Sequence, residues 1–409
     1  MTLWVSRRML TCPLLFVPAR GWGGEHFSDR LSVNGITWFD PAEVKTMATA
    51  TIKRHVLPGE EGGDTAWFYR QNAFEQQEIF RQVAFKRRRW PELGDGGASK
   101  RSTYTYPHIL PAGHERLPFY EPLADAILAY LAEADIALHS EVLNLKSSQA
   151  ACLNFFFPFR QDLDLARSAL QPLLLGLRDV TGIEFEYTGP PEVTQWLGES
   201  ERGKRGLYRT SIDAAIFWIG RSKRKHTTLV EWKYTEHSFG ACSAFQSARK
   251  DDKARCRALD VARDRDPARS CLLTTGGDRR SRRYWEHMEE AGISLPAFAS
   301  VQGCPFQGPF YQLMRQFLLA AYLRQTGEAD ELEVVSIGFA RNTKLHEVPS
   351  QLRSLVDSGG EGVVGAWNAV LNGVPPMRHW TVEELMARVN KVEGIDLDWR
   401  NYLRERYDV

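Results

Sequence analysis

The stretch Thr210-Ser-Ile-Asp-Ala-Ala-Ile-Phe-Trp-Ile219 is followed, after a polar turn, by Thr227-Thr-Leu-Val-Glu-Trp-Lys-Tyr234. These two apolar runs predict neighbouring strands of a hairpin. Successive side chains of a strand point to opposite faces of a sheet, so Glu231 and Lys233 share one face. The hairpin is expected to bring Asp213 beside them. Two carboxylates and one ammonium group would therefore converge at one place.

The segments around this hairpin predict a mixed sheet flanked by helices, in an α/β or α+β core. Helices are expected over residues 66–90, 120–135, 141–157, 162–177 and 309–325. Further strands are expected over residues 182–188, 270–274 and 332–339. We divide the chain into a poorly ordered extension or mis-assigned start (1–60), a helical N-terminal region (61–139), the core (140–345) and an acidic, helical C-terminal region (346–409).

The charge of the whole chain is nearly balanced, with a formal net charge of +1. Composition therefore gives no whole-molecule argument for binding nucleic acid. Locally, residues 249–283 contain 12 Lys and Arg against 6 Asp and Glu. This basic stretch permits an anionic ligand at one face of the protein.

The cysteines and the N-terminus indicate a cytoplasmic protein. Six cysteines without a CxxC pair fit reduced thiols. Arg7 and Arg8 precede an apolar run as in a signal peptide, but Pro13 interrupts it and no small-x-small cleavage site follows. No apolar run approaches the roughly 20 residues needed to span a bilayer, so we expect no membrane association.

Asp213 and Glu231 offer hard oxygen ligands that suit Mg²⁺ or Mn²⁺ and leave positions for water and a phosphate oxygen. Such an ion polarises a phosphodiester and lowers the pKa of bound water. Lys233 would orient the attacking water or steady the charged transition state. An acid-x-Lys spacing alone is more often a solvated strand face with a cross-strand pair. Here both acids sit in apolar runs, where an unpaired carboxylate is costly, which favours a shared functional site.

The chain resembles the PD-(D/E)XK nuclease superfamily, with Asp213 matching the first acid of its motif and Glu231-Trp-Lys233 matching its E-x-K. It is further similar to a bacterial restriction-endonuclease-like branch. The strings that resemble accessory motifs of that branch are Tyr106-Pro-His-Ile-Leu-Pro111, Asn144-Leu-Lys-Ser-Ser-Gln-Ala150, Asn154-Phe-Phe-Phe-Pro158 and Pro309-Phe-Tyr-Gln-Leu-Met-Arg-Gln316. The resemblance covers residues 104–320 and implies a central sheet flanked by helices and Mg²⁺-dependent cleavage of phosphodiesters.

Further site residues follow from the resemblance and from spacing. Many members of the superfamily add an acid on the helix before the first core strand; Glu141 is the candidate for catalysis and metal binding, with Gln149 as a polar substitute. Glu141 equally fits an ordinary first-turn acid. Glu236 is interpreted as exposed rather than as a further ligand. Gln312 and Arg315 share a helix face, where they either reach a phosphate or pair with the acids of the sheet.

Two basic clusters are interpreted as contacts to a phosphate backbone, although turns are often basic only for solubility. They are Lys223, Arg224 and Lys225 in the hairpin turn, and Arg279, Arg280, Arg282 and Arg283 farther along the chain.

Other chemistries find less support in the sequence. It contains no HExxH, Walker A or GxSxG motif. The iron–sulfur nucleases of the superfamily need clustered cysteines after the core. Cys242, Cys256, Cys271 and Cys304 are spaced 14, 15 and 33 residues apart and do not fit that pattern.

The first functional hypothesis is a Mg²⁺-dependent DNA endonuclease serving bacterial restriction or anti-phage defence. RNA is an alternative substrate, and double-strand cutting would favour a homodimer. Methyltransferase or motor activity would belong to partner proteins of a defence system. A second hypothesis is a catalytically silent nucleic-acid-binding or scaffolding module, which the intact Asp213, Glu231 and Lys233 argue against. A third is a toxin-like RNA nuclease controlled by a partner.

Overall fold

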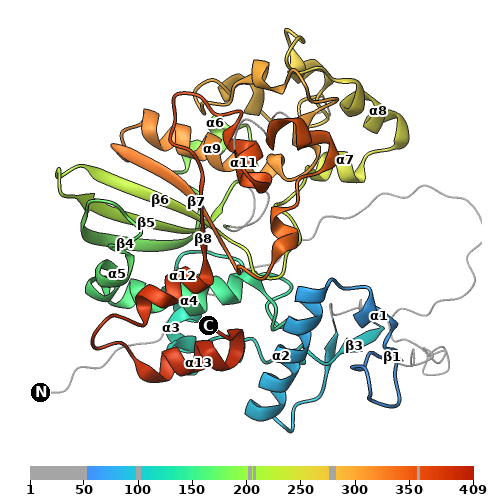
Figure 1. Ribbon diagram of the computed structural model, residues 1–409, viewed down its shortest axis with the longest axis vertical. Helices are drawn as coiled ribbons and strands as arrows, with labels where there is room; N and C mark the ends of the chain where they lie inside the picture. The colour runs from blue at the N-terminus through green and yellow to red at the C-terminus, as the bar shows by residue number, and fades with distance from the viewer. Residues whose placement is uncertain (1–52, 98–102, 201–204, 206–208, 276–281, 357–359) are drawn as a thin grey trace, which may run out of the picture. The chain divides into compact units, whose positions relative to one another are not determined.

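A five-stranded sheet forms the centre of the fold (Figure 1). Its strands lie in the order β4 (Leu177–Tyr187), β5 (Ile212–Gly220), β6 (Lys225–Trp232), β7 (Glu331–Gly338) and β8 (Arg378–Thr381). Strands β4, β5 and β6 form an antiparallel meander, whereas β7 and β8 run parallel to β6. A parallel neighbour requires a crossover, and the long connection from β6 to β7 provides it. The predicted mixed sheet flanked by helices is confirmed.

The computed structural model describes residues 53–97, 103–200, 205, 209–275, 282–356 and 360–409. Most of the predicted extension over residues 1–60 therefore lies outside the described residues. Within the described ranges, no helix has both the length and the apolar character needed to cross a membrane.

Helices cover both faces of the sheet (Figure 1). On one side lie α3 (Glu121–Glu133), α4 (Ser148–Gln161), α5 (Leu163–Leu170), α12 (Val382–Val389) and α13 (Leu397–Tyr407). On the other side lie α9 (Phe310–Gln325), α6 (Glu192–Trp196), α7 (Ser243–Ser247), α8 (Lys250–Ala258) and α11 (Gly362–Asn368). The second side also holds the short 3₁₀ turns η2 (Pro267–Ser270), η3 (Tyr284–His287), η4 (Leu295–Phe298), η5 (Pro305–Gln307), η6 (Thr343–His346) and η7 (Ser350–Leu355).

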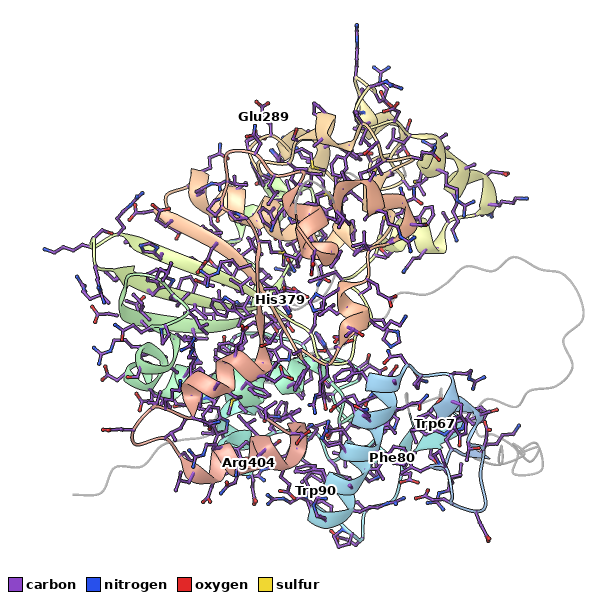
Figure 2. The ribbon with its side chains drawn as sticks, in the orientation of Figure 1. Trp67, Phe80, Trp90, Glu289, His379 and Arg404 are labelled. Carbon is purple, nitrogen blue, oxygen red and sulfur yellow. The ribbon has the colours of Figure 1, made fainter. Side chains whose placement is uncertain are left out.

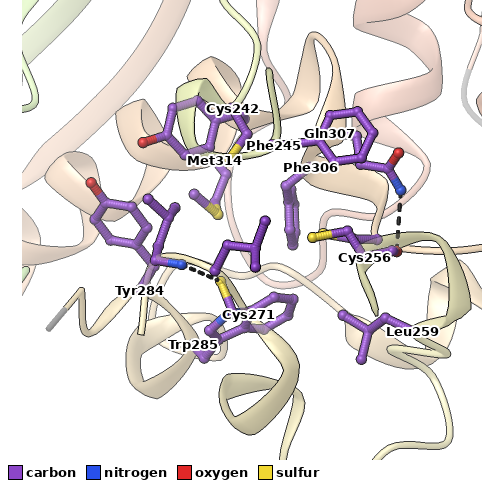
Figure 3. A pocket seen from close by; sticks show the side chains of 14 residues that line it. Cys242, Phe245, Cys256, Leu259, Cys271, Tyr284, Trp285, Phe306, Gln307 and Met314 are labelled. Carbon is purple, nitrogen blue, oxygen red and sulfur yellow. Dashed lines mark hydrogen bonds between the residues drawn. The ribbon is translucent and has the colours of Figure 1, made fainter. Parts of the chain in front are cut away.

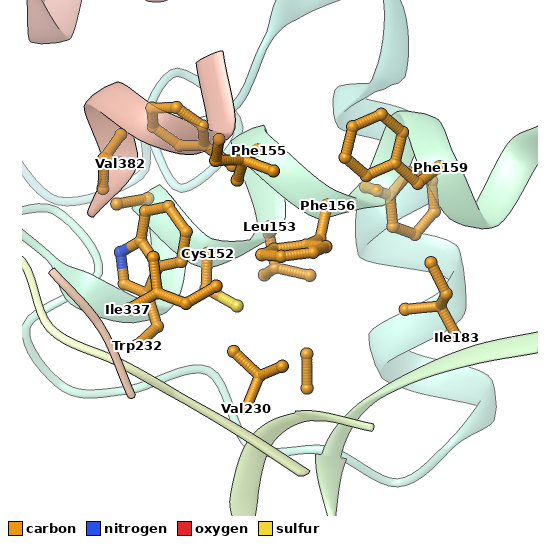
Figure 4. Close-up of a cluster of buried hydrophobic side chains, with 14 of the residues drawn as sticks. Cys152, Leu153, Phe155, Phe156, Phe159, Ile183, Val230, Trp232, Ile337 and Val382 are labelled. Carbon is orange, nitrogen blue, oxygen red and sulfur yellow. The ribbon is translucent and has the colours of Figure 1, made fainter. Parts of the chain in front are cut away.

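Alternation along β6 separates two hydrophobic cores. Val230 and Trp232 enter the core beneath α4, where the Trp232 ring centroid lies 4.8 Å from that of Phe155 (Figure 4). Leu229 belongs to the core on the α9 side. Because side chains of a strand alternate, Glu231 also faces α9. The burial of large apolar residues on either side of it, worth about 1.5–3 kcal/mol each, fixes which way Glu231 points.

The N-terminal region docks through buried polar contacts. It contains α1 (Ala66–Tyr69), α2 (Ala73–Arg89) and a small sheet of β1 (Lys53–Arg54), β3 (Tyr104–Tyr106) and β2 (Gly96–Gly97). Gln82 of α2 donates to the hydroxyl of Tyr234 at 2.7 Å and to the carbonyl of Arg406 at 2.8 Å. The Tyr234 hydroxyl donates to Glu78 at 2.7 Å. These contacts hold α2 against the segment that leaves β6.

Helix caps explain where two predicted helices differ from the structure. The helix expected over residues 66–90 is interrupted before Ala73, because the Asn72 side chain accepts the N–H of Glu75 at 2.9 Å and starts a new helix. The helix expected from residue 141 begins only at Ser148, where Ser147 accepts the N–H of Ala150 at 3.3 Å. Residues 141–147 form turns instead.

Three further boundaries differ. Residues 270–274 are not a strand: Ser270 ends η2, a turn follows, and Leu272 is buried there as a core residue of the α9 side. Helix α5 ends at Leu170, short of the expected residue 177, where β4 already begins. Strand β8 comes from the C-terminal region, which the sequence indicated only as helical. At four residues, β8 is too short to show a clear alternation.

Candidate active site

A row of polar side chains crosses the sheet. Ala214 pairs with Val230, so Asp213 and Glu231, one step farther along their strands, lie opposite each other. Asp213 Oδ2 also accepts the backbone N–H of Trp232 at 2.7 Å. This hydrogen bond fixes the carboxylate of β5 against the end of β6.

The row continues to both edges of the sheet. Glu231 pairs with Ser336 of β7, and Ser336 pairs with His379 of β8. On the other edge Glu186 of β4 falls between the pairs that join β4 to β5, beside Asp213. Ser336 Oγ lies 2.8 Å from Nδ1 of the half-buried His379, which is labelled in Figure 2. Burial lowers the pKa of His379 to about 4, so its ring is neutral at physiological pH.

The three acids of this row open into one cleft with a volume of about 630 Å³. The acidic side chains that line it are Glu75, Glu141, Glu186, Asp213, Glu231 and Glu236, and the basic ones are His139, Lys146, Lys233 and His237. Asp213, Glu231 and Lys233, which the sequence indicated as the chemical core, therefore meet at one place.

Glu231 is held by three side-chain donors. Lys233 Nζ lies 2.7 Å from its Oε1, and Gln312 Nε2 donates to the same oxygen at 2.5 Å. Gln316 donates to Oε2. Both glutamines come from α9, four residues apart and thus on one helix face. Burial raises the pKa of Glu231, and the charge of Lys233 counteracts this rise.

Negative charge exceeds positive charge at this point. Burial raises the pKa of Asp213 well above its ordinary value, and the charges of Glu231 and Glu186 add to the rise. Although burial lowers the pKa of Lys233, the charges of Glu231, Glu236 and Asp213 raise it overall. Lys233 therefore stays protonated, and one ammonium group faces several carboxylates. Such a site gains stability from a further cation.

Asp213 and Glu231 are the side chains that could hold a divalent cation here. Oxygen ligands are what Mg²⁺ and Mn²⁺ prefer, and the electrostatics favour a positive ion. Among the described residues, no three His, Cys, Asp or Glu side chains converge closely enough to form a complete ion site. A divalent ion would therefore keep several water ligands, as Mg²⁺ commonly does.

Glu186 is an acid of the site that the sequence did not single out. Its backbone has φ +45°, a conformation that non-glycine residues rarely adopt within a strand. Its carboxylate accepts from Gln149 Nε2 at 2.9 Å and lies 3.2 Å from His139 Nε2. Alternation along the strand predicts that Glu186 shares a face with Glu184. It does not predict which strand pairs with β4, so the sequence did not place Glu186 beside Asp213.

The additional acids and amides predicted near the site occupy different positions. Glu141 lies in a turn, exposed, at the wall of the cleft. Gln149 is buried and contacts Glu186 instead. Glu236, interpreted as exposed, is half-buried and lines the cleft, with one oxygen accepting the N–H of Tyr234 at 2.8 Å and the other the hydroxyl of Ser148.

Gln312 and Arg315 do not reach the same target. Gln312 lines the cleft and contacts Glu231. Arg315 instead donates to Thr210 Oγ1 at 3.0 Å and lies 3.6 Å from Glu199 Oε1, whose side chain is almost fully buried. Its role in binding a phosphate remains a prediction.

The predicted basic contacts lie apart from the acids or outside the described residues. Lys223 and Arg224 lie in the turn at the far end of the hairpin, Lys225 begins β6, and Arg224 pairs with Glu331. Arg282 donates to the carbonyl of Gly198 at 2.8 Å, and Arg283 pairs with Glu286 at 2.7 Å. Arg279 and Arg280 are outside the described residues.

A mixed sheet with helices on both faces, and the half-buried Asp213 beside the buried Glu231 and Lys233 at a cleft, is the architecture of a restriction-endonuclease-like protein. A family model described as restriction endonuclease associating with ARP matches residues 78–408. The match covers most of the chain, so the chain belongs to this family. No curated protein and no solved structure matches it.

Proposed function

We propose that this protein is a Mg²⁺- or Mn²⁺-dependent endonuclease of the PD-(D/E)XK type that hydrolyses DNA. The observation that carries the proposal is the opposition of Asp213 and Glu231 across two strands, with Lys233 Nζ 2.7 Å from Glu231 Oε1. This arrangement supports the assignment of the three side chains to the two acids and the lysine of the motif.

The residues of the cleft would divide the work. Asp213 and Glu231 would hold the ion, which when bound polarises the phosphodiester and lowers the pKa of its water. Lys233, protonated and buried, would stabilise charge that develops on the phosphate. Gln312, at the wall of the cleft, would keep Glu231 oriented toward the ion. Glu186 adds negative charge beside Asp213 and so strengthens the demand for a cation.

We extend the association named in the family description to this chain, and so propose ARP as its partner in restriction or anti-phage defence. The exposed basic residues of α8, Lys250, Arg255 and Arg257, would contact a phosphate backbone without regard to sequence.

One observation favours a second candidate, a nucleic-acid-binding module without cleavage. Both carboxylate oxygens of Glu231 already have donors, from Lys233, Gln312 and Gln316, and an acid saturated in this way is also what a structural role would require. The two candidates differ in what substitution of Asp213 does.

The test is incubation of supercoiled plasmid with the protein and Mg²⁺ or Mn²⁺, in parallel with Asp213→Asn, Glu231→Gln and Lys233→Met. Glu184→Gln is the matched control, because Glu184 lies on β4 two residues from Glu186 but is half-exposed and pairs with Arg205. Nicking or linearisation by the parent and the control alone supports the nuclease. Equal DNA retention by all five proteins in a gel shift, with no cutting, supports the binding module.

A further inference from the structure

A second cavity, on the opposite flank of α9 from the acids, is lined by four cysteines (Figure 3). They are Cys242 before α7, Cys256 in α8, Cys271 after η2 and Cys304 before η5. Almost everything else around the cavity is apolar, including Phe245, Leu272, Trp285, Phe306 and Met314. Four segments separated by 14, 15 and 33 residues thus fold back to a single point.

The four sulfurs lie within electrostatic reach of one another. Burial raises the pKa of the Cys304 thiol well above its ordinary value and that of Cys256 to about 11, and charges on the neighbouring cysteines add to both rises. All four thiols are free rather than joined in disulfides. They form one cluster, although their spacing in the sequence gave no sign of it.

Backbone N–H groups point at the sulfurs. The donors are Ala244 and Phe245 for Cys242, Leu272 for Cys256, Leu273 at 3.4 Å for Cys271, and Phe306 for Cys304. Three of these donors come from the second residue after the cysteine that they contact. Such donors stabilise a thiolate, and hydrogen bonds to the sulfurs are a regular feature of metal–thiolate centres.

A close backbone approach at Gly303 brings the segments that carry Cys256 and Cys304 together. Gly303 has φ +78°, and a Cβ there would lie 2.9 Å from the carbonyl oxygen of Arg257 and 3.1 Å from that of Cys256. The N–H of Cys304 then donates to the Cys256 carbonyl at 2.7 Å. Only glycine combines this backbone conformation with this close approach.

Buried cysteines often act simply as small apolar residues. That reading explains one thiol in an apolar core, and Cys152 beneath the other face of the sheet is such a case. It does not explain four thiols around one cavity, each with a backbone donor. The described residues of the surrounding segment, 242–275 and 282–307, form short helices and 3₁₀ turns joined by loops, which is the kind of structure that a metal stabilises.

We propose that Cys242, Cys256, Cys271 and Cys304 are the four thiolate ligands of a structural metal centre. Four cysteine thiolates bind either a zinc ion or an iron–sulfur cluster. A zinc ion at about 2.3 Å from each sulfur would need the sulfurs roughly 3.8 Å apart. Among the described residues, no three His, Cys, Asp or Glu side chains are grouped closely enough to hold a metal ion, so binding of either centre requires the four thiols to move closer together. The proposal is independent of the nuclease assignment.

The position of the centre links it to the cleft. Tyr311 and Met314 of α9 line the cysteine cavity, while Gln312 and Gln316 of the same helix contact Glu231. Gln312 also accepts the N–H of Gly240 at 2.6 Å, two residues before Cys242. A centre at the cysteines would therefore fix α9 and, with it, the glutamine contacts of the catalytic acid. It would also hold the basic α8 in place.

The experiment is purification of the full chain without oxygen, followed by elemental analysis for iron and zinc, sulfide determination and visible absorption spectroscopy. We expect close to one centre per chain. Cys256→Ser and Cys304→Ser should each reduce the metal content at least about tenfold, because each removes a ligand. The matched control Cys152→Ser replaces a buried thiol outside the cavity and should retain the metal.

Iron with sulfide and visible absorbance would identify a cluster, whereas zinc without colour would identify a single ion; both support the four-thiolate centre. If a cysteine variant fails to fold, the parent protein still decides the matter. Parent protein purified without metal, which then takes up neither Fe²⁺ with sulfide nor Co²⁺ as a coloured thiolate complex, would overturn the proposal. Metal retained equally in the Cys256→Ser and Cys304→Ser variants would overturn it as well.

Discussion

Lys233 Nζ lies 2.7 Å from Glu231 Oε1, and the two side chains are only 8% and 3% exposed. Glu231 lies in β6 and Lys233 directly follows the strand, so the buried end of β6 brings both charges into the interior together. Each charge is compensated by its neighbour, and Gln312 and Gln316 complete the acceptor sites of the carboxylate. This pair is the most strongly coupled part of the candidate site.

Breaking the pair on one side should be costly. Lys233→Met leaves a buried carboxylate without its cation, and we expect a loss of about 3–5 kcal/mol in the free energy of unfolding. The double variant Glu231→Gln/Lys233→Met should recover a large part of this loss, because no unpaired charge remains. Urea unfolding followed by circular dichroism measures both. As a control, Arg224→Met, which breaks an exposed pair with Glu331, should cost less than about 1 kcal/mol. A double variant as unstable as Lys233→Met would contradict the coupling.

Substitution of Asp213 should stabilise the metal-free protein at neutral pH. The pKa of Asp213 is raised in the folded state, so between its unfolded pKa, about 3.9, and its folded pKa the native chain binds more protons than the unfolded chain. Stability therefore falls as the pH rises through this window. Asp213→Asn removes this loss, while its side-chain oxygen can still accept the N–H of Trp232.

Unfolding free energies of the parent and Asp213→Asn, measured in EDTA from pH 3 to pH 8, check this expectation. The curves should approach each other below pH 4 and separate as the pH rises, with the variant above the parent. If the parent instead gains stability relative to the variant as the pH rises, the pKa of Asp213 is not raised in the folded state.

Divalent cations should raise the stability of the parent. An ion that binds only the folded state stabilises it by about 2.7 kcal/mol at a concentration one hundred times its Kd. Thermal unfolding with increasing Mg²⁺ or Mn²⁺ should therefore move Tm upward in the parent and in Glu184→Gln. Asp213→Ala and Glu231→Ala should show little response. An equal shift in all four proteins would assign the ion to another place.

Substitution of the two glutamines of α9, Gln312 and Gln316, should lower the free energy of unfolding by different amounts. Gln316 is almost fully buried. Gln316→Met therefore removes the donor to Glu231 Oε2 at a place that water cannot reach. We expect a cost of about 1.5–3 kcal/mol for loss of this hydrogen bond to a charged group. Gln312 lines the open cleft, where water can take over, so Gln312→Met should cost less. Chemical denaturation measures the free energy of unfolding of both variants. A larger loss for Gln312→Met than for Gln316→Met would contradict this prediction.

Alternation along two strands was sufficient to predict the meeting of Asp213, Glu231 and Lys233, since it depends only on strand geometry and a short hairpin. The meander and the helices on both faces followed from the same local patterns. Short-range capping corrected the details: Ser147 and Asn72 start helices where apolar periodicity alone suggested continuous ones.

What the sequence did not reveal depends on contacts between distant segments. Glu186 and Gln316 reach the site through strand order and helix packing, neither of which is encoded in local spacing. The short strand β8 carries too few residues for a pattern. The cysteines show the same limit most clearly, because intervals of 14, 15 and 33 residues say nothing about loops that return to one cavity.

The crossover from β6 to β7 has a consequence for how such a protein can diversify. Strands β6 and β7 keep their register, Glu231 beside Ser336, whatever the length of the chain that joins them. The part of the crossover between Lys233 and α9 can therefore change in length or sequence, provided that α9 keeps Gln312 and Gln316 against Glu231. Related proteins could therefore differ in the surface that this segment presents to targets and partners, while Asp213 and Glu231 keep their positions in the sheet.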